Sequence, residues 1–179
     1  MPLDLQQPQP AALITAVMAP DDEVLQAVGR DLAEAFGPVS KVGPTYPFAF
    51  SRYYDREMGA GLTKQLLWFE DLVDPAQLAQ IKGRAMNLER QWAQERDGAV
   101  CRRVNIDPGL VTIESLVLAT TKYSGHRICI GPALYAEVTL LYQKGQYRPF
   151  EWTYADYQDP KVGRFLLEIR ADLMARRQA

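Results

Sequence analysis

The residue types best suited to chemistry gather in one segment of the chain, between positions 103 and 137. Valine, isoleucine and leucine dominate this segment, which otherwise resembles buried strand. The polar residues that interrupt it are Arg103, Asn105, Asp107, Lys122, His126, Arg127 and Glu137. Burying such groups is costly unless they are paired or used. We therefore place the candidate site in this segment, as a polar site built on its strands.

Arg103, Asn105 and Asp107 occupy alternate positions, with Val104 and Ile106 between them. Alternate residues of a strand share a face. If the valine and the isoleucine face the core, a guanidinium, an amide and a carboxylate line the other face and could bind a polar ligand through forked hydrogen bonds. The equally open alternative is a solvent face with an Arg103–Asp107 ion pair and an Asp-Pro-Gly turn.

His126 is the only histidine of the chain, so one chain has no two-histidine metal site. An imidazole is the natural candidate for acid–base catalysis near neutral pH. For a lone histidine we favour the simpler interpretation, a strand-edge residue bonded to a backbone carbonyl. Lys122 and Arg127 flank it and, together with Arg103, would suit a phosphate or a carboxylate.

Glu137 lies in the middle of an apolar strand, a position that disfavours glutamate. Our default expectation is an ion pair with Arg103 or Arg127 across the sheet. The alternative makes Glu137 and Asp107 two carboxylates of a metal or general-base site. The candidate catalytic residues are therefore His126, Asp107 and Glu137, and we assign neither a metal nor a cofactor.

Aromatic residues cluster in two further segments, where they alternate with other residues. These are Tyr46, Phe48 and Phe50, close to Tyr53 and Tyr54, and then Phe150, Trp152 and Tyr154. We expect secondary core beneath long loops. The sharper alternative is a pocket rim in which Tyr54 and Trp152 stack against a ring of the ligand.

Local patterns predict the elements that must position these residues. An apolar strand over 12–18 leads into a helix from Asp21 to Phe36, ended by Gly37-Pro38. A short strand and a long ordered loop fill 39–61, and a strand follows over 62–69. Asp74-Pro75 begins a second helix, which we expect to reach Asp97-Gly98.

The second half of the chain is predicted to be richer in strands. A strand over 100–106 is closed by the turn at 107–109. Residues 110–121 fit either a helix or a strand. Strands over 126–130 and 135–143 form a hairpin around Gly131-Pro132, and a helix covers 161–177. This order predicts an α+β fold in one domain over 11–179, with a ferredoxin-like βαββαβ core, an added C-terminal hairpin and a terminal helix. Residues 1–10 are expected to be a disordered lead-in.

Composition excludes several classes of protein. The chain of 179 residues is 47% hydrophobic and 23% charged, which suits one globular domain. A net charge of −2 makes nucleic acid an improbable partner. We expect no signal peptide and no membrane span, and hence a cytoplasmic protein. Cys101 and Cys129 lack CxxC spacing, and we expect both to be small buried thiols.

The standard nucleotide and hydrolase motifs are absent from the sequence. There is no GxxxxGK[ST] or GxGxxG loop, and no GxSxG, HExxH or paired CxxC motif. A GTPase also needs a guanine-reading loop of the Asn-Lys-x-Asp kind, which is missing.

Several longer segments resemble a known family. They are RRVNIDPG from Arg102, LVLATTK from Leu116, HRI from His126, YAEVTL from Tyr135 and WTYADY from Trp152, with Tyr46-Pro-Phe48 and the run from Tyr53 to Gly59. Over nearly the whole chain they resemble an uncharacterised prokaryotic domain-of-unknown-function family, whose members are sometimes labelled GTP-binding proteins. The resemblance implies kinship without an established activity. The chain departs from the family at 123–125, where an acidic residue often follows the lysine.

Two classes of function remain. The first is a small-molecule site, binding or enzymatic, for an anionic or nucleotide-like ligand held by Arg103, Lys122 and Arg127. The second is a non-catalytic interaction or assembly protein, such as a homodimer, in which the polar strand residues form structural ion pairs. The first predicts that the side chains converge in one pocket.

Overall fold

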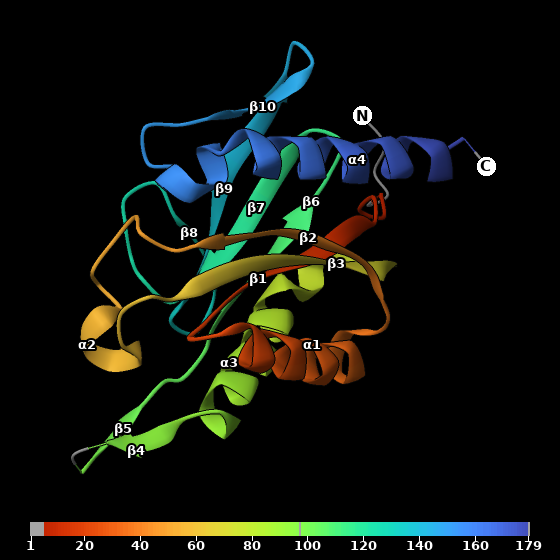
Figure 1. Ribbon diagram of the computed structural model, residues 1–179. Helices are drawn as coiled ribbons and strands as arrows, with labels where there is room; N and C mark the ends of the chain where they lie inside the picture. Colours follow the sequence, from red (N-terminus) through yellow and green to blue (C-terminus); the bar gives the residue numbers. More distant parts are fainter. Residues whose placement is uncertain (1–5, 97, 179) are drawn as a thin grey trace.

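The apolar run Ala11–Ala19 forms the centre of the computed structural model, which describes residues 6–96 and 98–178 (Figure 1). Within these residues the chain forms four α-helices, a mostly antiparallel sheet of eight strands and a separate two-stranded ribbon. The strands are β1 (Ala11–Ala19), β2 (Val39–Pro47), β3 (Thr63–Val73), β4 (Gln94–Arg96), β5 (Ala99–Cys101), β6 (Asn105–Val111), β7 (Ser115–Thr120), β8 (Ile128–Gly131), β9 (Leu134–Gln143) and β10 (Gln146–Pro149). The helices are α1 (Asp22–Phe36), α2 (Asp55–Met58), α3 (Leu78–Gln91) and α4 (Pro160–Arg176), with 3₁₀ turns η1 (Pro75–Gln77) and η2 (Ala155–Gln158).

The large sheet has the order β10-β9-β7-β6-β1-β3-β2, and β8 pairs with β9 beside this path. Helices α1 and α3 cover one face and α4 covers the other (Figure 1). Leu13 and Val17 of β1 pack under α1 and α3, whereas Ile14 and Ala16 pack under α4. Burial on both faces explains why β1 reads as a continuous apolar run.

Local signals set both ends of α1 and the start of α4. Asp21 caps α1, since its carboxylate accepts the Val24 N–H at 2.8 Å, and Gly37 ends the helix at φ +97°. Asp159 caps α4 by accepting the Lys161 N–H at 2.7 Å. Such caps satisfy amide groups that the first turn of a helix leaves without partners.

The predicted end of the second helix is wrong. α3 ends at Gln91, and the chain then forms the β4–β5 ribbon, whose turn contains Gly98 at φ +74°. Trp92 fixes the helix end, because its indole Nε1 donates to Asp31 of α1 at 2.7 Å. In Figure 1 the ribbon projects away from the body of the molecule.

The predicted turn at 107–109 is also wrong, because these residues lie inside β6. Pro108 lies opposite Thr15 of β1, and pairing with β7 begins only at Gly109. A proline has no N–H for a second strand. A Cβ at Gly109 would come within 2.6 Å of Leu118 Cδ2, so glycine permits the close approach of β7 there. Residues 105–108 are therefore paired with β1 only, and the sheet splits beside them.

Of the remaining expectations from the sequence, some are confirmed and one is wrong. Residues 110–121 form the end of β6 and the strand β7, and the hairpin around Gly131-Pro132 is present as β8 and β9. Cys129 is exposed on β8 and Cys101 is half-buried, so the expectation of buried thiols is wrong. Of the expected lead-in, residues 1–5 lie outside the described part, and residues 6–10 are exposed without regular structure. Among the described helices, none has the length and apolarity needed to span a membrane.

Candidate functional site

A cavity of about 570 Å³ opens where β6 and β7 separate. Helix α3 borders it from one face of the sheet, and η2 borders it from the other. The loop after β2 and the loop after β7 complete its walls. The residues that line it are Met18, Phe48, Phe50, Ser51, Tyr53, Tyr54, Lys64, Lys82, Met86, Glu89, Arg90, Ala93, Val100, Arg102, Asn105, Asp107, Leu118, Ala119, Thr120, Thr121, Lys122, Arg127, Glu137, Tyr154, Ala155, Asp156 and Tyr157.

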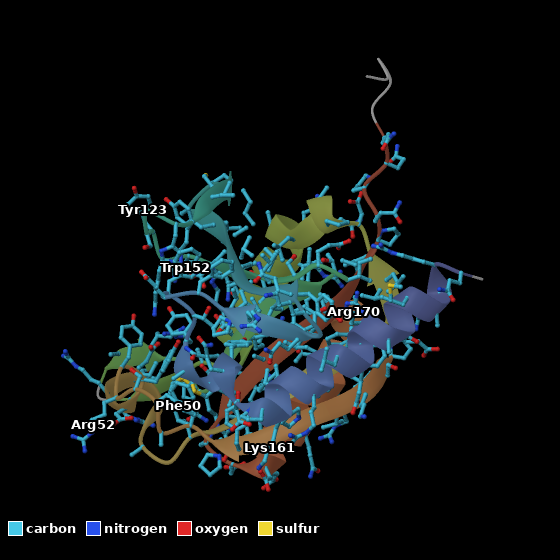
Figure 2. The ribbon with its side chains drawn as sticks, turned by 90° about the horizontal axis from the view of Figure 1, so that it is seen from above. Phe50, Arg52, Tyr123, Trp152, Lys161 and Arg170 are labelled. Carbon is cyan, nitrogen blue, oxygen red and sulfur yellow. The ribbon has the colours of Figure 1, made fainter. Side chains whose placement is uncertain are left out.

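Most of the residues selected from the sequence meet in this cavity. Those in its lining are Tyr54, Asn105, Asp107, Lys122, Arg127 and Glu137. His126, Trp152 and Arg103 are outside it. Phe50, Tyr123 and Trp152 lie at the end of the molecule away from the C-terminal end of α4 (Figure 2). The polar segment therefore contributes to one concave site, but Arg103 and His126, which the ligand-binding hypothesis also places in the pocket, are not in its lining.

Arg103 is not where the strand alternation places it. β6 begins only at Asn105, so the alternation does not extend back to Arg103, whose guanidinium carbon lies 5.8 Å from the centre of the Trp92 ring. Its neighbour Arg102 enters the cavity instead and forms a two-pronged ion pair with Glu57, at 2.8 and 2.7 Å. The expected Arg103–Asp107 pair is accordingly absent.

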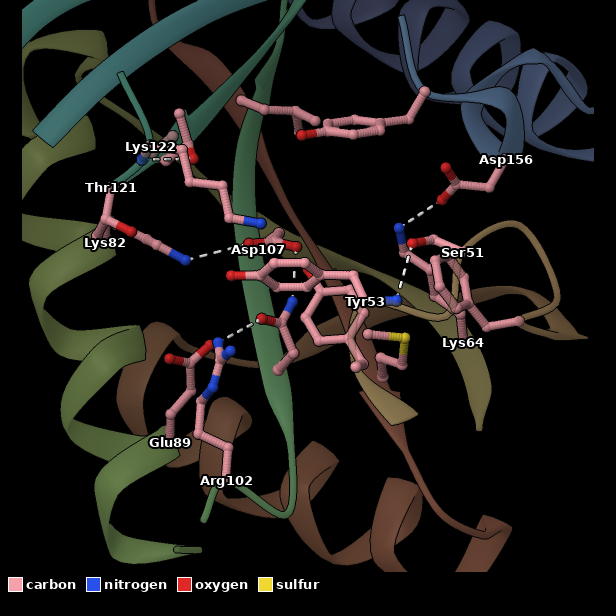
Figure 3. Close-up of a pocket in the computed structure, with 18 of the residues that line it drawn as sticks. Ser51, Tyr53, Lys64, Lys82, Glu89, Arg102, Asp107, Thr121, Lys122 and Asp156 are labelled. Carbon is pink, nitrogen blue, oxygen red and sulfur yellow. Dashed lines mark hydrogen bonds and ion pairs between the residues drawn. The ribbon is translucent and has the colours of Figure 1, made fainter. Parts of the chain in front are cut away.

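A chain of hydrogen bonds follows β6 along the cavity (Figure 3). Arg102 Nη1 donates to Asn105 Oδ1 at 3.0 Å, and Asn105 Nδ2 donates to Asp107 Oδ2 at 2.7 Å. Lys82 Nζ donates to Asp107 Oδ1 at 3.1 Å and to the Ile106 carbonyl at 2.8 Å. Burial alone would raise the pKa of Asp107, but the charges of Lys82 and Lys64 and these hydrogen bonds bring its pKa below the ordinary value. Asp107 is thus held as a carboxylate.

Glu137 forms the ion pair expected with Arg127. Arg127 Nε donates to Glu137 Oε2 at 2.8 Å, and the glutamate side chain is only 2% exposed. His126 Nε2 lies 2.8 Å from the same oxygen, its Nδ1 lies 3.0 Å from Ser124 Oγ, and its ring stacks on Trp152. The partners of His126 are thus a carboxylate and a hydroxyl, which corrects the expected backbone carbonyl.

Sequence reasoning missed six charged residues of the cavity: Lys64, Lys82, Glu89, Arg90, Arg102 and Asp156. Two of them could have been found from the sequence of α3, because Lys82 and Glu89 interrupt the apolar helix face that contains Leu78 and Ala85. Lys64 has an equivalent signal, because it alternates with Leu66 and Trp68 on the buried face of β3. A charge on a buried face is the feature that would have identified all three.

The outer part of the cavity is cationic and aromatic. Lys122 Nζ lies 3.8 Å from the centre of the Tyr53 ring and 5.7 Å from that of Tyr54. Among residues 6–96 and 98–178, no carboxylate lies within 4.0 Å of this ammonium group. Cationic side chains outnumber acidic ones in the lining, with Lys64, Lys82, Arg90, Arg102, Lys122 and Arg127 against Glu89, Asp107, Glu137 and Asp156. An anion would therefore be stabilised near Lys122.

The described residues contain no group of three or more metal-ligating side chains close enough to hold a metal ion. Asp107 and Glu137 do line the same cavity, but each is engaged by cationic neighbours. The geometry thus assigns these two carboxylates to ion pairs.

Glu89 should make stability depend on pH. Its Oε1 accepts the Ile106 N–H at 2.6 Å, and burial raises the pKa of its carboxyl above the ordinary 4.5. Between pH 4.5 and that raised pKa the folded state binds more protons than the unfolded state, so the free energy of unfolding falls as pH rises through this window. Glu89→Gln keeps the acceptor and stays neutral, so the stability of the variant relative to wild type should increase with pH.

Urea unfolding of both proteins from about pH 4 to about pH 8 tests this expectation. A stability difference that stays constant over the range would contradict the raised pKa.

Comparison with known proteins gives one family and no close relative of known activity. A family model described as "Domain of unknown function (DUF4416)" matches residues 9–173. No curated protein matches the chain, and no solved structure does.

Proposed function

Because the chain belongs to the DUF4416 family, a domain of unknown function, we propose a function from the cavity itself: it binds a small anionic ligand that carries a planar ring, as a nucleotide does. The observation that carries this proposal is the Lys122 ammonium group, which faces Tyr53 at 3.8 Å and lacks an acidic partner among the described residues. A cation beside aromatic rings suits an anionic group linked to a ring.

The size and lining of the cavity support the same proposal. A volume of about 570 Å³ lies within the usual range for small-molecule sites. Phe48, Phe50, Tyr53 and Tyr54 provide apolar ring surface, and Asn105 of β6 provides a buried polar group. Sites of this kind combine an apolar lining with a few placed polar groups that orient the ligand.

Ligand binding has more support here than catalysis. Glu137 already accepts a hydrogen bond from Arg127 and lies against His126, which is outside the cavity lining. Asp107 is held as a carboxylate by Lys82 and Asn105. A general base needs an acceptor free to take a proton from the substrate. In this proposal Arg127 and Glu137 shape the wall of the site.

Lys122→Met tests the proposal. We expect a nucleoside 5′-monophosphate to bind the wild type and to bind the variant about tenfold more weakly or worse, because a charge-assisted contact is lost. Isothermal titration calorimetry measures both affinities. Lys161→Met is the matched control, since Lys161 is exposed on α4 and is not among the residues that line the cavity.

Failure of all nucleoside monophosphates, and of inorganic phosphate, to bind the wild type at millimolar concentration would overturn the proposal. Equal affinity of the Lys122→Met variant and the wild type would remove Lys122 from the site.

We also propose that the first half of the fold is a ferredoxin-like core. The strands β6-β1-β3-β2 are neighbours in this order, and each neighbouring pair is antiparallel. Helices α1 and α3 connect them in the sequence β1-α1-β2-β3-α3-β6, interrupted by α2 and by the β4–β5 ribbon. This order and direction support a βαββαβ unit, to which β7–β10 and α4 are added.

A further inference from the structure

We infer that Asp107 and Lys82 select the ring of the ligand, by recognising a nitrogen heterocycle whose edge carries an N–H donor next to an acceptor. This inference rests on the proposed function and names the part of the ligand that Asp107 and Lys82 would bind. The two side chains come from neighbouring elements, β6 and α3, and point toward each other (Figure 3).

Asp107 supplies the acceptor. Each of its oxygens accepts one hydrogen bond, Oδ1 from Lys82 and Oδ2 from Asn105. A carboxylate oxygen has two lone-pair sites, so each oxygen retains capacity for another donor. The side chain is 30% exposed and lines the cavity, which leaves this capacity open to a ligand. A ring N–H or an exocyclic amino group of the ligand would donate to one of these oxygens.

Lys82 supplies the neighbouring donor. Its ammonium group has three N–H bonds, of which one is directed to the Ile106 carbonyl and one to Asp107. The third has no partner among the described residues, and Lys82 lines the cavity. Because the ammonium group is held 3.1 Å from Asp107 Oδ1, the donor and the acceptor sit side by side. A heterocycle edge with an acceptor beside an N–H matches this arrangement.

The test compares ligands that differ only at the ring edge. Adenosine and inosine 5′-monophosphates both carry an N–H donor beside an acceptor, whereas purine riboside 5′-monophosphate has the same ring and phosphate without that donor. We expect at least one of the first two to bind the wild type about tenfold or more tightly than purine riboside 5′-monophosphate, because the third ligand buries Asp107 without a new partner. Calorimetry gives the three affinities.

The variant Asp107→Asn should reduce this difference to about twofold or less, since a neutral amide accepts hydrogen bonds more weakly than a carboxylate, and its NH₂ group can donate to the ring nitrogen of purine riboside 5′-monophosphate. Equal wild-type affinities for all three nucleotides would overturn the inference and leave the proposed function standing. A preserved tenfold difference in Asp107→Asn would also overturn it. Absence of any binding, with inorganic phosphate silent too, would instead reject the proposed function.

Discussion

Replacing Asp156 with alanine is expected to lower the free energy of unfolding by about 3–5 kcal/mol, because it leaves a buried ammonium group without its carboxylate. Asp156 forms an ion pair with Lys64, and the two side chains are only 3% and 8% exposed. Tyr46 also donates to Asp156, at 3.4 Å. Urea unfolding, followed by tryptophan fluorescence, measures the loss.

An exposed ion pair between a lysine and a carboxylate is the control. Lys41 and Glu168 pair on the surface with side-chain exposures of 48% and 51%, so Glu168→Ala should cost about 1 kcal/mol or less. The double variant Lys64→Met/Asp156→Leu should recover much of the stability lost in Asp156→Ala, since it removes both charges. Equal effects of Asp156→Ala and Glu168→Ala would show that burial does not govern the pair.

The second large effect is expected at Arg127. Arg127→Met should lower the free energy of unfolding by about 3 kcal/mol, because Glu137 would lose the guanidinium partner of a carboxylate that is 2% exposed. His126 remains beside Glu137 in the variant, so the loss should fall at the lower end of the range for broken buried pairs. Thermal and urea unfolding at neutral pH would report it.

Neutralising the carboxylate provides the control for this prediction. Arg127→Met/Glu137→Gln should be more stable than Arg127→Met, because glutamine carries no charge that needs a partner. If the double variant is as unstable as the single one, lost packing of the arginine side chain, rather than the orphaned charge, explains the destabilisation.

The sequence predicted the elements whose signals are local. For α1 these signals are a capping aspartate, an apolar stripe and a terminal glycine, and for α4 they are an apolar stripe and a basic last turn. The predicted turn at 107–109 failed because long-range pairing overrides local preference there. Asp-Pro-Gly is typical of turns, but β1 pairs with β6 through Pro108 and holds the segment extended.

The sequence also identified part of the candidate site. Asn105, Asp107 and Glu137 stood out because they are polar residues in apolar strands, and they do line the cavity. Lys82 and Glu89 had a signal of the same kind on a helix face. Asp156 could not be identified in this way, since a single 3₁₀ turn has too few residues to show a periodic apolar pattern. Arg103 was misplaced because β6 begins after it.

The position of α4 has a consequence for how the chain is made. This helix, near the C-terminus, covers a face that contains Ile14 of β1 and Leu66 of β3, which are synthesised much earlier. Until Phe165 and Ile169 have left the ribosome, that apolar face has no cover from the helix. Partly made chains with exposed apolar surface tend to associate. The nascent protein is therefore expected to be prone to association until α4 docks on the sheet.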